Sequence, residues 1–308
     1  MLPNDFYTHL SEKGLIELSG PEKEKYLQGQ VTADVNLLSA STALLACHCD
    51  FKGKTWSVSY LLKWQDKILM LLHRSVLEKS LAELKKYGVF AKVEMTDSTD
   101  KWRISGGAGK VIEAEIIRIF GQLPETNQGL VQNEQGVVMA LQGTAMRYLV
   151  MQPLDAKDQL SIEPDMQAQN QWEAEDIKAG IADIRQATIN EFVPQMMNLQ
   201  QLNAISFTKG CYMGQEVVAR TKYLGKNKRA AFRLHADGEH SCQPGDSLEL
   251  QLGENWRPGG TILRTSCIKG QSWLLAVLNH ETEIGTQLRL KNSPESIFTV
   301  LPHPYELA

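Results

Sequence analysis

Residues 208–233 read TKGCYMGQEVVARTKYLGKNKRAAFR, and this stretch separates two parts of the chain that differ in their pattern of apolar and polar residues. Downstream of about Gly225, short apolar runs such as RAAFRLHA, DSLELQL and SWLLAVLN alternate with turn residues at roughly ten-residue intervals. This spacing predicts a small β-barrel or sandwich. We therefore place a domain boundary between residues 1–225 and residues 226–308.

The upstream region mixes helical and strand-like patterns. Apolar residues recur at spacings of three and four over residues 75–87, which predicts an amphipathic helix, and residues 109–121 predict a second helix closed by a glycine. Two apolar runs within residues 44–64, separated by a polar turn, predict a hairpin, and VFAKVEM at 89–95 alternates like a strand. This order favours α+β lobes with mainly antiparallel sheets over one doubly wound sheet.

The composition narrows the class of protein. The chain has 308 residues, of which 43% are hydrophobic and 22% charged, as in ordinary soluble proteins. Every apolar run is shorter than the ~20 residues of a membrane helix, so we expect no membrane span. Five cysteines without a CxxC pair fit a reducing compartment, and the amino terminus lacks a signal-like segment, so we expect a cytoplasmic protein. A net charge of −4 argues against a protein that coats nucleic acid with its whole surface.

Cys211 is the most informative cysteine. It lies between two glycines, just before a predicted helix that begins near Gly214 and carries Glu216 in its first turn. Lys209 and the positive end of that helix would both favour a thiolate at Cys211. The alternative is a buried cysteine in a tight turn, which the residue types alone favour.

A basic cluster follows this motif without an intervening acid. It could hold phosphates or the carboxylates of a polyanionic ligand, and a solvated linker is the alternative. Its members are Arg220, Lys222, Lys226, Lys228, Arg229 and Arg233, with Tyr223 and Phe232 between them.

Two other sequence patterns bear on ligand binding. Cys47, His48 and Cys49 are adjacent in a predicted strand, where neighbours point to opposite faces, and no second ligand pair follows, so we predict no metal site. Trp172 lies on the charged helical segment QWEAEDIKAG, where a large apolar ring must find a partner.

The string KGCYMGQE, followed by VVAR and NKRA, closely resembles the K-G-C-Y-x-G-Q-E signature of the YgfZ family, folate-binding proteins linked to tRNA modification and iron–sulfur enzyme maintenance. EKYLQGQVTADV, LLACHCD, LKKYGVFAKV, QWEAEDIKAG and GENWR also resemble family sequences, in the expected order. The resemblance implies a fold similar to the aminomethyltransferase of the glycine cleavage system. Such a fold has two ferredoxin-like α+β lobes around a central folate cavity and a C-terminal β-barrel; whether the lobes are interleaved in sequence stays open.

The resemblance also implies site residues. It places a reactive-thiol motif on Lys209, Gly210, Cys211, Tyr212, Gly214, Gln215 and Glu216, with Cys211 and Lys209 as its centre. It places a folate-contacting tryptophan on Trp172, whose ring would stack on the pterin. A second family tryptophan falls at about Lys13, and Lys178 stands where relatives often carry an acid suited to a pterin edge. The anion-binding candidates are Arg220, Lys226, Lys228 and Arg229.

We therefore predict a monomeric, folate-binding accessory protein that uses tetrahydrofolate or a derivative and supports iron–sulfur enzymes, among them those that thiolate tRNA. Residues 53–58, GKTWSV, lack the aspartates that aminomethyltransferases carry there, which disfavours simple aminomethyl transfer. One alternative is a one-carbon transferase that consumes a folate adduct. Another is a direct tRNA-binding module that uses residues 220–233. Because the net charge of the chain is acidic, this alternative is the least favoured.

Overall fold

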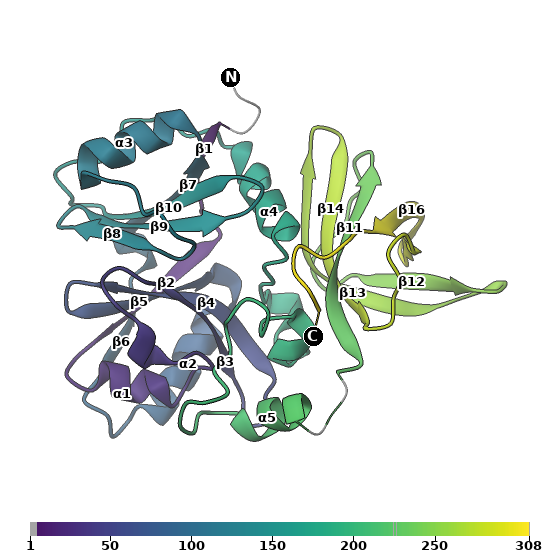
Figure 1. The fold of residues 1–308 in the computed structure, drawn as a ribbon, viewed down its shortest axis with the longest axis horizontal. Helices are drawn as coiled ribbons and strands as arrows, with labels where there is room; N and C mark the ends of the chain where they lie inside the picture. The colour runs from purple at the N-terminus through teal and green to yellow at the C-terminus, as the bar shows by residue number, and fades with distance from the viewer. Residues whose placement is uncertain (1–4, 224, 226, 308) are drawn as a thin grey trace.

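The computed structural model describes residues 5–223, 225 and 227–307. Two five-stranded antiparallel sheets lie against each other, and a closed six-stranded barrel lies beside them (Figure 1). This mixed α/β architecture with a C-terminal barrel confirms the predicted fold class. Within the described ranges, no helix combines the length and the apolar character needed to cross a membrane. The domain boundary at residues 225 and 226 stays a prediction.

Lobe A contains the sheet with strand order β1-β7-β10-β9-β8. Helix α3 (Lys110–Phe120) covers one face of this sheet with buried isoleucines, and Gly121 ends it in the left-handed conformation at φ 81°, as the sequence predicts. The strands are β1 (Phe6–His9), β7 (Trp102–Ala108), β8 (Leu130–Asn133), β9 (Gly136–Gln142) and β10 (Met146–Pro153).

Lobe B contains the sheet with strand order β3-β4-β5-β2-β6, and its chain segment is inserted between β1 and β7 of lobe A. The predicted hairpin is confirmed as β3 paired with β4, and the predicted helix as α2. The strands are β2 (Lys13–Ser19), β3 (Leu44–Cys49), β4 (Thr55–Trp64), β5 (Lys67–His73) and β6 (Glu94–Asp97); the helices are α1 (Lys23–Gln28) and α2 (Leu77–Tyr87).

The predicted strand at residues 89–95 is largely wrong. Gly88 ends α2, and the Ala91 amide bonds to the Gly88 carbonyl, so the chain turns where a strand would pair. Phe90 is fully exposed, and β6 begins only at Glu94. The alternating pattern here reflects a solvent-facing turn, because an alternation of residue types carries no information about whether a partner strand is present.

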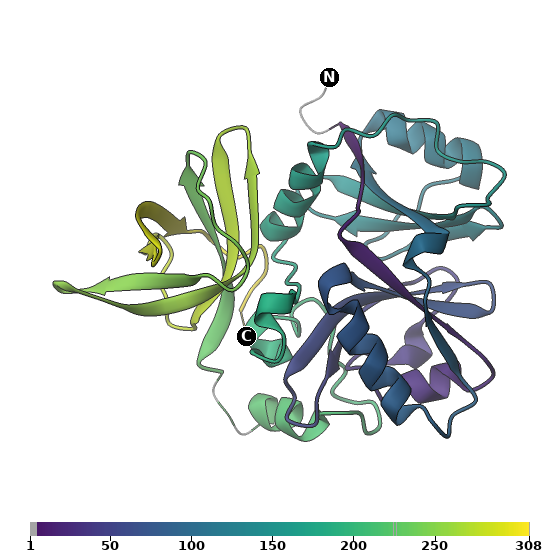
Figure 2. The same cartoon turned by 180° about the vertical axis from the view of Figure 1, so that it is seen from behind.

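The two sheets share an apolar core. Leu15 and Leu71 of lobe B meet Ile104 and Leu149 of lobe A in one buried cluster. Figure 2 shows the chain crossing from β1 in one sheet to β2 in the other. The lobes are therefore tied together by covalent crossovers as well as by burial of apolar surface.

The barrel closes in the order β11-β14-β13-β12-β15-β16. Its interior is apolar, and its outer face also contributes side chains such as Leu263 and Val277 to the lobe B core. The barrel is thus joined to the lobes, with helix α4 (Ala168–Lys178) between them and α5 (Gln215–Tyr223) preceding the first barrel strand (Figure 1). The strands are β11 (Arg229–Asp237), β12 (Ser247–Leu252), β13 (Asn255–Ile268), β14 (Gln271–Asn279), β15 (Gln287–Leu290) and β16 (Ser293–Val300).

Candidate functional site

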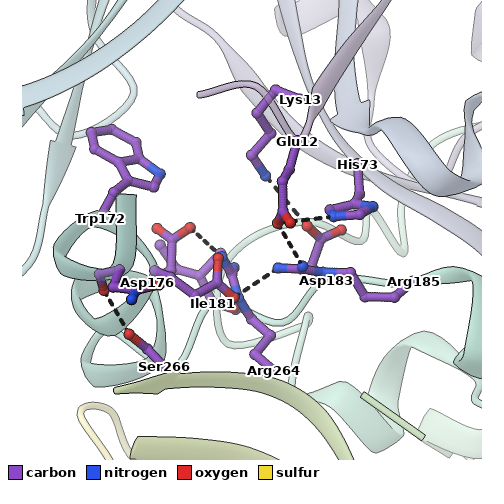
Figure 3. Close-up of polar contacts among 12 residues, drawn as sticks. Glu12, Lys13, His73, Trp172, Asp176, Ile181, Asp183, Arg185, Arg264 and Ser266 are labelled. Atoms are coloured by element: carbon purple, nitrogen blue, oxygen red, sulfur yellow. Dashed lines mark hydrogen bonds and ion pairs between the residues drawn. The ribbon is translucent and has the colours of Figure 1, made fainter. Parts of the chain in front are cut away.

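A buried cluster of ion pairs lies where the two lobes, α4 and the barrel meet (Figure 3). Its side chains come from β2, β10, α4, the segment after α4 and β13, which are far apart in sequence. We call it the junction cluster; its members are Lys13, Arg147, Glu173, Asp176, Asp183, Arg185 and Arg264.

Arg264 of the barrel is the centre of the junction cluster. Its side chain is 1% exposed and contacts both carboxylate oxygens of Glu173 at 2.7 Å and Asp176 at 2.6 Å. Its remaining nitrogen donates to the Ile181 carbonyl at 2.9 Å. Arg147 of lobe A bonds the other oxygen of Asp176. One α4 carboxylate therefore links lobe A to the barrel.

The acids of the cluster are held ionised. Burial alone would raise the pKa of Glu173, but the Arg264 and Arg185 guanidinium groups outweigh it and lower that pKa to about 2. Burial alone would also raise the pKa of Asp183, but the positive charges of Lys13 and Arg185 outweigh it and lower that pKa to about 2. The cluster therefore offers a fixed pattern of charge at neutral pH.

Trp172 is buried at the edge of this cluster. The Arg147 guanidinium lies over its ring at 4.4 Å, and Gly106 of β7 lies so close that an added Cβ would be 2.4 Å from the indole Cε3. These contacts are the packing partners that the sequence predicts for the Trp172 ring. The indole Nε1 is buried and has no hydrogen-bond partner among the described residues. Figure 3 shows this nitrogen edge turned toward the side on which the Lys13 ammonium lies.

Lys13 connects the junction cluster to a cavity. Its Nζ pairs with Asp183 at 3.3 Å, and its side chain also lines a cavity of about 340 Å³ between the β1–β2 turn and β7. Arg74 and Arg103 add positive charge to the wall, where Asp100 is the acid. The volume is in the range of small-molecule sites.

The Cys211 motif is anchored on lobe B. The Lys209 ammonium is buried, donates to the Val31 carbonyl at 2.8 Å and the Ala33 carbonyl at 2.6 Å, and burial lowers its pKa to about 8. Gly214 has φ +82°, and an added Cβ there would be 2.5 Å from the Asp50 carbonyl, so the turn requires glycine. The Cys211 side chain is exposed, which differs from the buried alternative.

The rest of the motif follows the predicted local structure. Tyr212 is buried with its ring 5.1 Å from the Lys209 ammonium. Helix α5 begins at Gln215, and Glu216 lies in its first turn, as predicted.

The structure does not bring Trp172 and Cys211 together. Trp172 packs on β7 and β10 of lobe A, whereas the residues around Cys211 dock on the α1 end and the β3–β4 turn of lobe B. Figure 1 shows α4 and α5 at different levels of the molecule. The two candidate sites are therefore separate.

The other predicted residues divide between surface and interior. Arg220, Lys228 and Arg229 are exposed, whereas Arg233 donates to the Pro302 and Lys178 carbonyls. Lys178 pairs with Glu175 at 3.0 Å and lies over the Trp273 ring at 4.9 Å, so it faces the barrel. Lys226 lies outside the described residues.

His48 and its neighbouring cysteines are buried. Burial lowers the pKa of His48 to about 3 and raises that of Cys47 to about 12. His48 Nδ1 lies 2.8 Å from Ser80 Oγ, on the face of β3 that α2 covers. In the described part of the chain, no group of three or more His, Cys, Asp or Glu side chains is placed to hold a metal ion.

Sequence reasoning missed most of the junction cluster. No sequence motif indicates four residues that are central to it: Arg147, Glu173, Asp176 and Arg264. A signal is present in the sequence of α4, where the acids Glu173, Glu175 and Asp176 are interleaved with Trp172, Ala174 and Ile177 so that no separate polar face forms. Such a helix needs partners on every side.

Comparison with known proteins finds relatives of this chain both by sequence and by fold. Residues 227–293 match the family described as "YgfZ, beta-barrel domain". The tRNA-modifying protein YgfZ of Pectobacterium carotovorum subsp. carotovorum is 41% identical over 303 residues, which cover 97% of this chain and 91% of that protein. The protein of the same name from Yersinia enterocolitica is 39% identical over 303 residues, with 97% and 92% covered.

The fold is also found in a solved structure. The glycine cleavage system aminomethyltransferase T from Bartonella henselae superposes with a TM-score of 0.72 at 11% identity, covering 98% of this chain and 86% of that one. The predicted aminomethyltransferase-like fold is confirmed.

Proposed function

Because this chain belongs to the YgfZ family, we propose that it is a folate-binding accessory protein that supports tRNA modification through iron–sulfur enzymes. The relatives carry the name tRNA-modifying protein, and the family motif around Cys211 is complete here. The two lobes and the barrel meet at the junction cluster, with Trp172 at its edge.

The observation that carries folate binding is the buried, unpartnered Nε1 of Trp172. A buried donor without a partner costs about 1–3 kcal/mol, which an acceptor on a bound ligand would recover. The ring nitrogens and carbonyl of a pterin are such acceptors. Arg147 already covers one ring face, so we propose recognition through the Nε1 edge in place of stacking on that face.

The remaining residues fit the rest of a folate. Lys13 faces the same region as the Trp172 nitrogen and lines the adjoining cavity, where Arg74 and Arg103 suit the carboxylates of a glutamyl tail. When bound, tetrahydrofolate carries one-carbon units on its nitrogens. The protein residues bind and orient it, while the ionised carboxylates of the junction cluster keep their positions because each is paired with an arginine or lysine.

We propose that Cys211 supplies the thiol that acts on client enzymes. Its side chain is exposed, and Lys209 and Gly214 fix the segment on either side of it against lobe B. Because the Cys211 segment packs against lobe B and Trp172 packs against lobe A, we propose that folate binding and thiol chemistry are separable functions.

Calorimetric titration with tetrahydrofolate tests the folate site. Trp172→Phe keeps an aromatic ring but removes Nε1, and losing one hydrogen bond is expected to weaken binding by roughly 2- to 13-fold. The matched control is Trp273→Phe, which removes another buried, unpartnered indole nitrogen from the barrel and leaves affinity unchanged. No binding by the native protein, or equal weakening by both variants, would remove the folate proposal.

Complementation tests the thiol. In cells lacking the native protein, Cys211→Ser is expected to abolish support of tRNA thiolation, while the purified variant keeps its circular dichroism spectrum and its affinity for tetrahydrofolate. Cys267→Ser, at a partly buried barrel position, is the control and keeps full support. Full support by Cys211→Ser would rule out the thiol role.

A further inference from the structure

Two strongly exposed aromatic side chains flank the Cys211 segment. Phe51, in the β3–β4 turn, is 68% exposed, and Tyr223, at the end of α5, is 64% exposed. Each has a lysine ammonium near its ring, Lys52 at 5.5 Å and Lys222 at 5.4 Å. Exposed apolar surface rimmed by polar residues marks interaction sites, so these two rings are candidates for a binding surface.

The β3–β4 turn and α5 form one continuous surface. A Cβ added to Gly53 would be 3.1 Å from the Val217 side chain, and one added to Gly214 would be 2.9 Å from the Gly53 Cα. At the C-terminal end of α5, Phe207 meets the Tyr223 ring edge-on with centroids 6.4 Å apart. The aromatic rings are therefore presented by backbone segments that hold each other in place.

The charge of this surface is mainly positive, although the whole chain has a net charge of −4. Glu216 is the exposed acid of α5, and the Asp50 carboxylate accepts the Lys52 and Lys54 amides of the turn. The exposed cations on or beside the surface are Lys52, Arg220, Lys222, Lys228 and Arg229. Positive charge is thus concentrated around the exposed rings.

We propose that this aromatic–basic surface, made by Phe51, Lys52, Phe207, Arg220, Lys222 and Tyr223, binds unpaired nucleotides of an RNA. Bases stack on exposed aromatic rings, and the neighbouring cations contact phosphates. The carboxylates of an acidic protein partner would pair with the cations but, unlike the flat faces of bases, would not stack on the rings. Bound nucleotides would lie near Cys211, which is in the segment that leads into α5 at Gln215. The inference goes beyond the folate proposal and uses none of its residues.

Fluorescence anisotropy with a labelled hairpin RNA that has an unpaired loop tests the surface, with folate-free protein at low salt. The native protein is expected to bind, and Tyr223→Ala and Phe51→Ala each to weaken binding by roughly 5- to 160-fold, the range of one lost stacking contact. Lys222→Gln is expected to reduce the slope of log affinity against log salt by about 0.7, the value for one phosphate contact on a single strand.

The matched control is Tyr87→Ala on α2, where Lys86 lies 5.2 Å from an exposed tyrosine ring just as Lys222 does at Tyr223. This variant is expected to bind RNA like the native protein. The proposal is overturned if the native protein does not bind the hairpin, if Tyr223→Ala and Phe51→Ala bind as well as native, if Tyr87→Ala weakens binding equally, or if a blunt duplex binds as tightly as the hairpin. Because no folate is present, none of these results depends on the tetrahydrofolate site.

Discussion

Arg264→Met probes how strongly the junction cluster holds the barrel on the lobes. Removing this guanidinium takes four hydrogen bonds from a side chain that is 1% exposed. Glu173 keeps Arg185 at 2.7 Å, and Asp176 keeps Arg147, so neither carboxylate is left alone. Breaking a buried pair costs about 3–5 kcal/mol, and the surviving partners place this variant near 3 kcal/mol.

Urea unfolding followed by circular dichroism measures that loss. If all 308 residues unfold together, the loss corresponds to about 5 °C in melting temperature. Arg289→Met is the control, because Arg289 pairs with Glu249 at 2.8 Å but is partly exposed, and its loss should stay within about 1 kcal/mol. An Arg264→Met protein as stable as native would refute the reasoning, since a methionine would then replace the ion pairs without cost.

The packing at Gly106, the ionisation of Glu173 and the exposure of Cys211 can each be tested separately. Gly106→Ala forces a Cβ to 2.4 Å from an indole carbon and should lower stability by about 1–3 kcal/mol in thermal unfolding, whereas Gly210→Ala meets nothing within 4 Å; equal effects would contradict the packing. The folded-state pKa of Glu173, about 2, lies below the unfolded value near 4.3, so its stabilisation is complete above that value and is lost as the pH falls toward 2. An acid titration should show that the Glu173→Gln variant loses less stability over that interval than the native protein. Parallel stability curves for the two proteins would contradict the stabilising role of Glu173. Iodoacetamide with mass spectrometry should modify exposed Cys211 first and buried Cys47 only after unfolding, and early modification of Cys47 would show that lobe B opens.

Local elements could be predicted from the sequence because their signals are local. The hairpin of β3 and β4 and the helix closed by Gly121 each depend on residues within one short window. The junction cluster could not be found this way, since Arg264 meets Glu173 across 91 positions and only after the barrel docks on α4.

Lys209 also shows that a local sequence pattern does not indicate contacts with residues far away in the chain. The motif predicted a cation that favours the Cys211 thiolate, but the ammonium binds carbonyls at residues 31 and 33, more than 170 positions away. Nothing near Lys209 in the sequence indicates those acceptors. The exposure of Cys211 follows from how that anchored turn lies on lobe B.

The insertion of lobe B between β1 and β7 has a consequence for synthesis on the ribosome. Residues 13–97 can complete their own sheet as soon as they emerge, because β2 to β6 pair only with one another. The first strand, in contrast, pairs Phe6 with Ala108 and has to wait until β7 is translated. At 5–20 residues per second this delay lasts about 5–20 seconds, during which an unpaired strand edge stays exposed to other nascent chains or to chaperones.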